Sequence, residues 1–168
     1  MKMIKLFLIT TIILIISSCE KEKNDMTIVE LSMEISYKTH NDVDLLNPEN
    51  ENSFNEEQIK LYHYAEGESN LFYQENFHHP NGFYIYKEKG LSEYYYLRIS
   101  EPNDYDNGSE LNPYEAITLL ELDEGVVDTI KCKIEKGENS LICKQIIYNN
   151  DIVWDWDDYT ERRFTIIK

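Results

Sequence analysis

Apolar and polar residues alternate with a period of two along much of this chain, and this pattern limits the fold more than any other feature. From residue 29 to residue 38, apolar side chains occupy every second position. The alternation returns in residues 94–99 and 128–135. Because successive side chains of a β-strand point to opposite faces, each segment is expected to form a strand with one buried face.

Turn signals separate these segments at short intervals. The clearest are Pro80-Asn81-Gly82, Gly137 and Asn149-Asn150, whose residue types suit tight turns. Further strands are expected in residues 59–64, 71–73, 83–87, 116–122, 141–148, 152–154 and 164–167. No segment after residue 25 has a long helical period. The chain is therefore predicted to be all-β, with about nine short antiparallel strands in a single β-sandwich or barrel-like domain over residues 26–168.

The first 18 residues have the composition of an export signal. Lys2 and Lys5 give a positive start, residues 6–16 are almost entirely apolar, and Ser17 and Ser18 follow. The apolar run is too short to span a membrane comfortably. This arrangement favours a cleaved signal peptide of residues 1–18 over a permanent anchor helix or a buried core helix.

The end of this signal, Ile16-Ser17-Ser18-Cys19, resembles the lipobox of bacterial lipoproteins. The resemblance implies cleavage before Cys19, a diacylglycerol on its thiol and an acylated amino group. Each buried methylene contributes about 0.8 kcal/mol, so two or more acyl chains hold a protein firmly in a membrane. Residues 19–25 are expected to form a flexible tether, because residues 20–25 contain no apolar side chain. The protein is expected at the outer membrane, facing the periplasm or the cell surface.

The charge of the chain excludes one large class of partners. The sequence has 16 basic and 32 acidic residues, and removal of residues 1–18 takes away two lysines, which leaves a net charge of −18. A nucleic-acid partner is excluded because phosphate binding requires basic clusters, and none occurs. Contact with anionic lipid headgroups is also disfavoured, so the expected contact with the membrane is the lipid anchor alone.

Cys132 and Cys143 are the remaining cysteines, and both lie in the predicted hairpin around Gly137. A two-residue turn at Gly137-Glu138 would place them directly opposite each other. An exported chain can oxidise such a pair, so a disulfide between Cys132 and Cys143 is expected. The alternative is two buried, reduced thiols, and a one-residue bulge would change the register.

The segment Trp154-Asp155-Trp156-Asp157-Asp158, with Tyr159 beside it, is the best candidate ligand-binding site. Alternate aromatic and carboxylate side chains combine an apolar platform with hydrogen-bond acceptors, which suits a sugar. The alternative places one tryptophan in the core and the other over an edge of the sheet.

Metal sites have weaker support in the sequence. Asp104 and Asp106 are calcium candidates, as is the segment Asp42-Val43-Asp44, but the loop after Asp104 does not have the spacing of an EF-hand. The four histidines show no ligand spacing, and His63 is expected to be a core residue or a residue at the rim of the core. No metal and no cofactor are expected.

The sequence contains no pattern that predicts a particular catalytic site. It has neither a GxSxG motif nor a glycine-rich phosphate loop, and only six glycines in all. These features favour a non-enzymatic binding or structural module of the cell envelope, with a glycan or a protein as partner. The alternative is a glycosidase-like envelope hydrolase that uses paired carboxylates.

Three segments resemble small, uncharacterised lipoproteins of Bacteroidetes-type bacteria. They are Asn41-Asp42-Val43-Asp44-Leu45-Leu46-Asn47-Pro48, Asp128-Thr129-Ile130-Lys131-Cys132 and Tyr148-Asn149-Asn150-Asp151. The resemblance implies a lipoprotein with a β-sandwich-like domain, and none of its motifs is catalytic. Residues 20–25 are loosely similar to the acidic tags that send such lipoproteins to the cell surface, which leaves both the surface and the periplasm open.

Overall fold

A computed structural model describes residues 28–106, 110–158 and 160–168 of the chain. In these ranges the chain forms eleven β-strands and two short 3-10 turns, and none of the described residues belongs to an α-helix. The all-β prediction is therefore confirmed. The expected signal peptide, Cys19 and the tether of residues 19–25 lie outside the described residues. No helix within the described ranges is long and apolar enough to cross a membrane.

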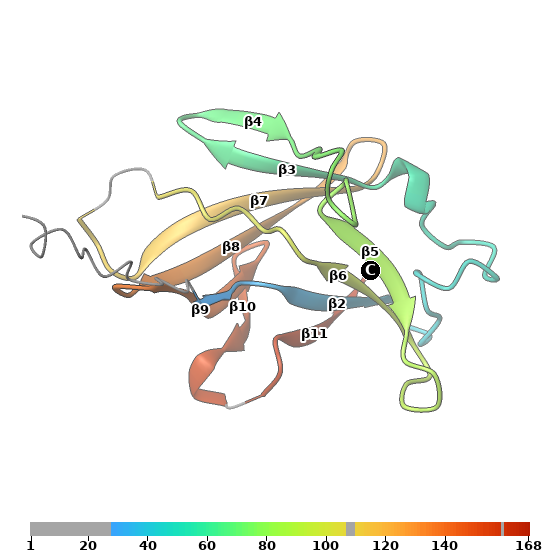
Figure 1. Ribbon diagram of the computed structural model, residues 1–168. Coiled ribbons are helices and arrows are strands. Elements are labelled where there is room, and N and C mark those ends of the chain that lie inside the picture. Colours follow the sequence, from blue (N-terminus) through green and yellow to red (C-terminus); the bar gives the residue numbers. More distant parts are fainter. Residues whose placement is uncertain (1–27, 107–109, 159) are drawn as a thin grey trace, which may run out of the picture.

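The larger of two sheets contains seven strands (Figure 1). They are β1 (Ile28–Glu30), β3 (Lys60–Ala65), β4 (Glu68–Leu71), β7 (Tyr114–Asp123), β8 (Val126–Lys136), β9 (Ser140–Tyr148) and β10 (Asp151–Asp155). Their order is β1-β9-β8-β7-β3-β4, and β10 also pairs with β9. The strands β3, β7, β8 and β9 follow the predicted segments closely, and in β7 and β8 buried and more exposed side chains alternate along the strand.

The smaller sheet contains four strands in the order β11-β2-β6-β5. They are β2 (Met33–Lys38), β5 (Phe83–Lys87), β6 (Tyr95–Ile99) and β11 (Arg163–Ile167), and the two 3-10 turns are η1 (Glu56–Gln58) and η2 (Trp156–Asp158). Two pairings, β1 with β9 and β11 with β2, are parallel, although the sequence pattern suggested antiparallel strands throughout. Both parallel pairs join segments that are far apart in the chain, so no local turn signal announces them.

The apolar faces of the two sheets share one core, as expected for a sandwich. Ile35 and Leu97 of the smaller sheet are completely buried, and so are Leu120, Ile130 and Ile146 of the larger sheet. Burial of a side chain of this size contributes about 1.5–3 kcal/mol, which makes the shared core the main stabilising feature of the fold. The opposite face of the smaller sheet carries polar and aromatic side chains.

The expected strand of residues 29–38 is divided between the two sheets. Residues 28–30 pair with β9 in the larger sheet, whereas residues 33–38 pair with β6 and β11 in the smaller one. Leu31 and Ser32 make the connection, and Leu31 is buried. The alternation of polar and apolar side chains continues through this crossing. The crossing brings Glu30, Ser32 and Glu34 to one side of the molecule.

The register of the hairpin between β8 and β9 differs from the prediction. The last pair before the turn is Lys136 and Leu141, and the backbone N–H of Gly137 donates to the carbonyl oxygen of Ser140 at 2.9 Å, so the turn is centred on Glu138-Asn139 instead of Gly137-Glu138. Lys133 pairs with Gln145 and Ile134 with Cys143, so Lys144 of β9 is an unpaired bulge residue that shifts the register once more. As a result Cys132 lies opposite Ile146 and not opposite Cys143. The prediction that the two cysteines face each other directly is therefore wrong.

Cys132 and Cys143 are buried free thiols, so the structure does not contain the predicted disulfide. The side chains still interact across the two strands. A hydrogen bond with Cys143 and complete burial raise the pKa of the Cys132 thiol well above its ordinary value. Because the thiolate is the reactive form, Cys132 is expected to be inert in the folded protein.

A thiol titration checks this arrangement. The native full chain should react with no equivalent of a thiol reagent, because Cys132 and Cys143 are 1% and 0% exposed. In denaturant the same chain should show two reactive thiols, given that Cys19 is expected to be acylated. No reactive thiol in denaturant would mean that the disulfide forms after all, and a third would mean that Cys19 carries no lipid.

Candidate functional site

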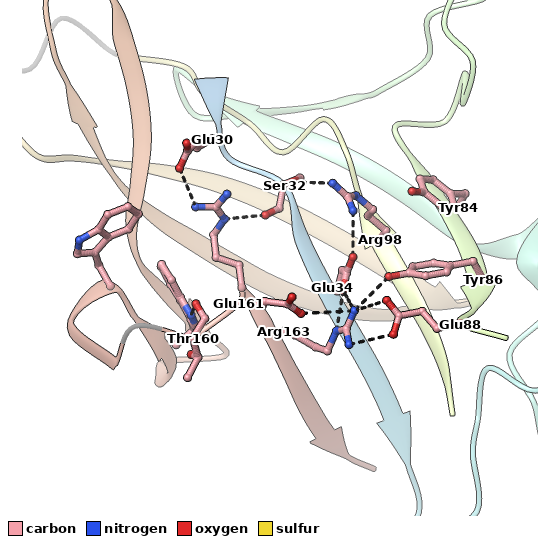
Figure 2. Close-up of a pocket in the computed structure, with 13 residues that line it drawn as sticks. Glu30, Ser32, Glu34, Tyr84, Tyr86, Glu88, Arg98, Thr160, Glu161 and Arg163 are labelled. Atoms are coloured by element: carbon pink, nitrogen blue, oxygen red, sulfur yellow. Dashed lines mark hydrogen bonds and ion pairs between the residues drawn. The ribbon is translucent and has the colours of Figure 1, made fainter. Parts of the chain in front are cut away.

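A cavity of about 640 Å³ opens on the outer face of the smaller sheet, beside the segment that joins β10 to β11 (Figure 2). We call it the sheet-face cleft. Its lining combines acidic, basic and aromatic side chains with two hydroxyl groups. They are Glu30, Glu34, Glu88, Glu161, Arg98, Arg162, Arg163, Tyr84, Tyr86, Trp154, Trp156, Ser32 and Thr160.

The floor of the cleft follows from the alternation in the four strands of the smaller sheet. Residues with odd numbers in β2 and β6 point into the core, so Glu34 and Arg98 point outward. Arg163 of β11 pairs with Glu34, Glu34 with Arg98, and Arg98 with Tyr84 of β5. These four side chains therefore form one row across the sheet, and side chains opposite each other in adjacent strands lie close enough to interact.

Glu34 lies at the centre of the row. Its Oε1 accepts a hydrogen bond of 3.0 Å from Nη1 of Arg98, and its Oε2 lies 2.6 Å from Nη2 of Arg163. Arg163 also contacts Glu88, with 2.9 Å between Nη2 and Oε1, and Glu161 at 3.7 Å (Figure 2). One carboxylate thus orients two arginines, and charge-assisted contacts of this kind are the stronger ones.

The pKa of Glu34 is lowered by its neighbours. Burial alone would raise it, but a hydrogen bond with Tyr86 and the charges of Arg163 and Arg98 outweigh burial. The side chain of Glu34 is only 12% exposed, so the ion pairs are partly shielded from water. Glu34 is consequently ionised at neutral pH and committed to its two arginines.

The other wall of the cleft contains both tryptophans. Nε of Arg162 donates to the carbonyl oxygen of Ser32 at 2.9 Å, and the guanidinium lies 5.8 Å from the ring centre of Trp154. Trp154 is 5% exposed and meets Trp156 edge to face, with ring centroids 6.4 Å apart. Trp156 is 37% exposed, and Lys144 lies over its ring at 4.2 Å.

The structure therefore brings two of the three predicted ligand-binding residues to the cleft, and Tyr159 lies outside the described residues. Trp154 is mostly a core residue, as the alternative reading of the sequence stated, whereas Trp156 has an accessible ring. The hydroxyl of Tyr84 and the indole N–H of Trp156 have no hydrogen-bond partner within the described ranges. These groups can serve a ligand without breaking an existing contact.

The carboxylates of Asp106 and Asp42 form ion pairs, whereas Asp104 is engaged through its backbone carbonyl. The carboxylate of Asp106 lies 3.1 Å from Nζ of Lys136, and the carbonyl oxygen of Asp104 accepts from the hydroxyl of Tyr114 at 2.8 Å. Asp42 pairs with Lys38. The described part of the chain holds no group of three or more side chains suited to a metal ion.

Sequence patterns did not identify the arginines of the cleft, although a signal was present. The chain has only three arginines, Arg98, Arg162 and Arg163, among 16 basic residues. All three line the cleft, together with both tryptophans of the chain. Arginine offers a planar set of donors that lysine lacks, so the presence of only three arginines in a lysine-rich chain was a usable indication of a site.

Replacement of Glu34 by glutamine should change the pH dependence of stability. The lowered pKa means that ionised Glu34 stabilises the fold above its ordinary value of 4.5, and this contribution is lost as the pH falls through the folded-state pKa. The difference in unfolding free energy between wild type and Glu34→Gln should therefore be largest near neutral pH and should shrink in acid.

Denaturant titrations at several pH values measure this difference. Glu161→Gln is the matched control, because Glu161 also contacts Arg163 but its side chain is 80% exposed. The unfolding free energy of Glu161→Gln should equal that of the wild type at every pH. An equal destabilisation of Glu34→Gln at every pH would contradict the role given to the ion pairs.

Comparison with known proteins gives no further assignment. No family model matches the chain, and neither a curated protein nor a solved structure is significantly similar to it.

Proposed function

We propose that this protein is a lipid-anchored cell-envelope protein whose sheet-face cleft binds a neutral carbohydrate without cleaving it. The observation that carries the proposal is the convergence of all three arginines and both tryptophans on one cleft. Residues of these two types dominate the energetics of many binding sites. The cleft, at about 640 Å³, lies within the usual range of about 300–1,000 Å³ for small-ligand sites.

A carbohydrate matches the chemistry of this lining. The ring of a sugar has an apolar face of C–H groups and an edge of hydroxyl groups. Lys144 lies over the Trp156 ring at 4.2 Å and His79 stacks on the Tyr84 ring at 4.0 Å, so each ring can offer one face to the apolar side of a sugar. The free donors on the same side chains suit the hydroxyl groups. The arginines and glutamates hold one another in fixed positions, so a ligand that meets them finds donors and acceptors already oriented.

The charge of the cleft favours a neutral ligand. Four glutamates line it against three arginines, and the whole chain has a net charge of −16. Each arginine is already paired with a carboxylate. A phosphate or a polyanion would therefore meet repulsion from the chain and would have to displace an existing ion pair.

Hydrolysis by paired carboxylates has less support. A glycosidase requires a carboxylic acid whose raised pKa keeps a proton available for the leaving group. Glu34, whose side chain is the least exposed among the cleft glutamates, has a lowered pKa instead. Its oxygens are occupied by Arg98 and Arg163, which suits a structural role in a binding site.

The proposed location depends mainly on residues 1–19. The apolar run and the lipobox-like Ile16-Ser17-Ser18-Cys19 support export and lipidation, and the three segments noted above support membership of a Bacteroidetes-type lipoprotein group. Mass spectrometry of the N-terminal peptide should show an acylated Cys19. A peptide that begins at Met1 without modification would contradict the anchor.

Binding can be tested with the full chain in detergent micelles on an array of neutral and acidic glycans. We expect binding to neutral glycans, and about a tenfold or greater loss of affinity in Trp156→Ala. Tyr64→Ala is the matched control, because Tyr64 has almost the same exposure, 38%, and lines none of the cavities. Binding to acidic glycans only, no binding at all, or full affinity in Trp156→Ala would contradict the proposal.

A further inference from the structure

We propose that the cleft is one half of a longer groove, and that its ligand is an oligosaccharide chain bound across two adjacent sites. The inference rests on the proposed function. A second cavity of about 630 Å³ adjoins the sheet-face cleft, and Ser32 and Arg98 line both cavities. We call it the second cavity.

Arg98 forms the boundary between the two cavities. Its Nη1 contacts Glu34 at 3.0 Å, while its Nη2 donates to Oγ of Ser32 at 3.2 Å. The side chain of Arg98 is 38% exposed, so its guanidinium is fixed in position but accessible. A ligand that passes over it would meet oriented donors at the midpoint of the groove.

The segment that crosses between the sheets runs below both cavities. Glu30 and Glu34 line the sheet-face cleft, whereas Val29 and Leu31 line the second cavity, and Ser32 belongs to both. The two cavities therefore lie next to each other along residues 29–34. A ligand that leaves one cavity along this segment enters the other.

The chemistry of the second cavity resembles that of the first. The His63 and Phe72 rings pack with centroids 4.8 Å apart, and Nε2 of His63 is 3.0 Å from the carbonyl oxygen of Glu101. These two contacts fix the His63 ring at the rim of the core. The exposed side chains of Gln74 and Asp104 add hydrogen-bonding groups next to this apolar surface. An apolar face beside polar groups again suits a sugar unit.

The combined volume of the two cavities favours an oligosaccharide over a single sugar. Each cavity alone falls within the usual range for small-ligand sites, and together they exceed its upper end of about 1,000 Å³. A single small sugar would leave one of the two cavities empty. Linked sugar units gain affinity at the second cavity without a second loss of translational freedom.

The test compares the affinity of the protein for short and long neutral oligosaccharides, of about two and about six sugar units. The gluco-, manno-, galacto- and xylo-series are each measured. The wild-type full chain should bind the longer members about tenfold or more tightly than the shorter members. Val29→Trp, which fills the second cavity, should abolish this gain and leave affinity for the short members unchanged. Val126→Trp is the matched control, since Val126 is 45% exposed, Val29 is 57% exposed, and Val126 lines neither cavity.

The outcomes distinguish failure of the two-site groove from failure of the proposed function. Equal affinity for short and long members, or an undiminished gain in Val29→Trp, overturns the two-site groove and leaves carbohydrate binding intact. Absence of binding at every length overturns the proposed function itself. If Val29→Trp does not fold, Gln74→Trp replaces it, because Gln74 lies at an exposed loop position of the second cavity. This variant should also lose the higher affinity for the longer oligosaccharides.

Discussion

Replacement of Asp128 by alanine is expected to lower the free energy of unfolding by about 3 kcal/mol, the lower end of the range for breaking a buried ion pair. Asp128 is 3% exposed. Its carboxylate accepts from the hydroxyl of Tyr148 at 2.6 Å and from Nδ2 of Asn149 at 2.6 Å, and it pairs with Nζ of Lys168 at 2.6 Å. The hydroxyl of Tyr148 in turn contacts that of Tyr37 inside the core.

The size of this effect follows from what the substitution leaves behind. The hydroxyl of Tyr148 and the amide of Asn149 lose a charged acceptor, and an unsatisfied buried group costs about 1–3 kcal/mol. Lys168 contributes less to the loss, because its side chain is 26% exposed and can be hydrated by water. Burial raises the pKa of Tyr148 and Tyr37, so in the wild type both phenols keep their protons at neutral pH.

Denaturant unfolding of the full chain measures the loss. Asp151→Ala is the control, because Asp151 is an exposed carboxylate at the start of β10 and should change stability by no more than about 0.5 kcal/mol. Equal stability of the two variants would show that the buried cluster does not connect the end of β11 to the larger sheet.

The second large effect is expected for Gly82→Ala, at about 2–5 kcal/mol. Gly82 has a φ of +77°, in a region that costs a residue with a side chain about 1–2 kcal/mol. A Cβ there would also lie 2.8 Å from the Phe72 ring and 3.4 Å from Leu61. Overpacking of this kind adds about 1–3 kcal/mol. Because Phe72 lines the second cavity, the variant should also weaken binding of long oligosaccharides.

Gly90→Ala separates the two causes. Gly90 has nearly the same φ, +79°, and no atom lies within 4 Å of the position that its Cβ would occupy. This control should show the backbone cost alone. If Gly82→Ala is no less stable than Gly90→Ala, the close contact with Phe72 is not a constraint on the fold.

Local pattern predicted much of this fold, because alternation determines which face of a strand is buried. The alternation in residues 128–135 predicted a strand with one buried face, and in β8 that face is buried at Ile130, Cys132 and Ile134. Local pattern could not predict the parallel pairing of β11 with β2, since partner choice depends on contacts between distant segments. The bulge at Lys144 of β9 could not be predicted either, because one unpaired residue leaves the composition of a strand unchanged.

The candidate site was only partly predictable for the same reason. Trp154 and Trp156 stand out in sequence because they are rare and close together. Arg98 and Glu34 are paired only through the register of β2 and β6, which the sequence does not state. Only the tertiary structure places these two residues beside Arg163, where the three side chains form one network of ion pairs.

Tryptophan fluorescence tests the central claim most directly, because the only tryptophans of the chain, Trp154 and Trp156, both line the sheet-face cleft. Titration of the full chain with a neutral oligosaccharide that it binds should shift the emission to shorter wavelength and reach saturation, since the ligand removes water from the ring of Trp156. Trp156→Phe should lose most of this shift. Saturable binding detected on the glycan array with unchanged tryptophan emission would place the ligand elsewhere and contradict the account.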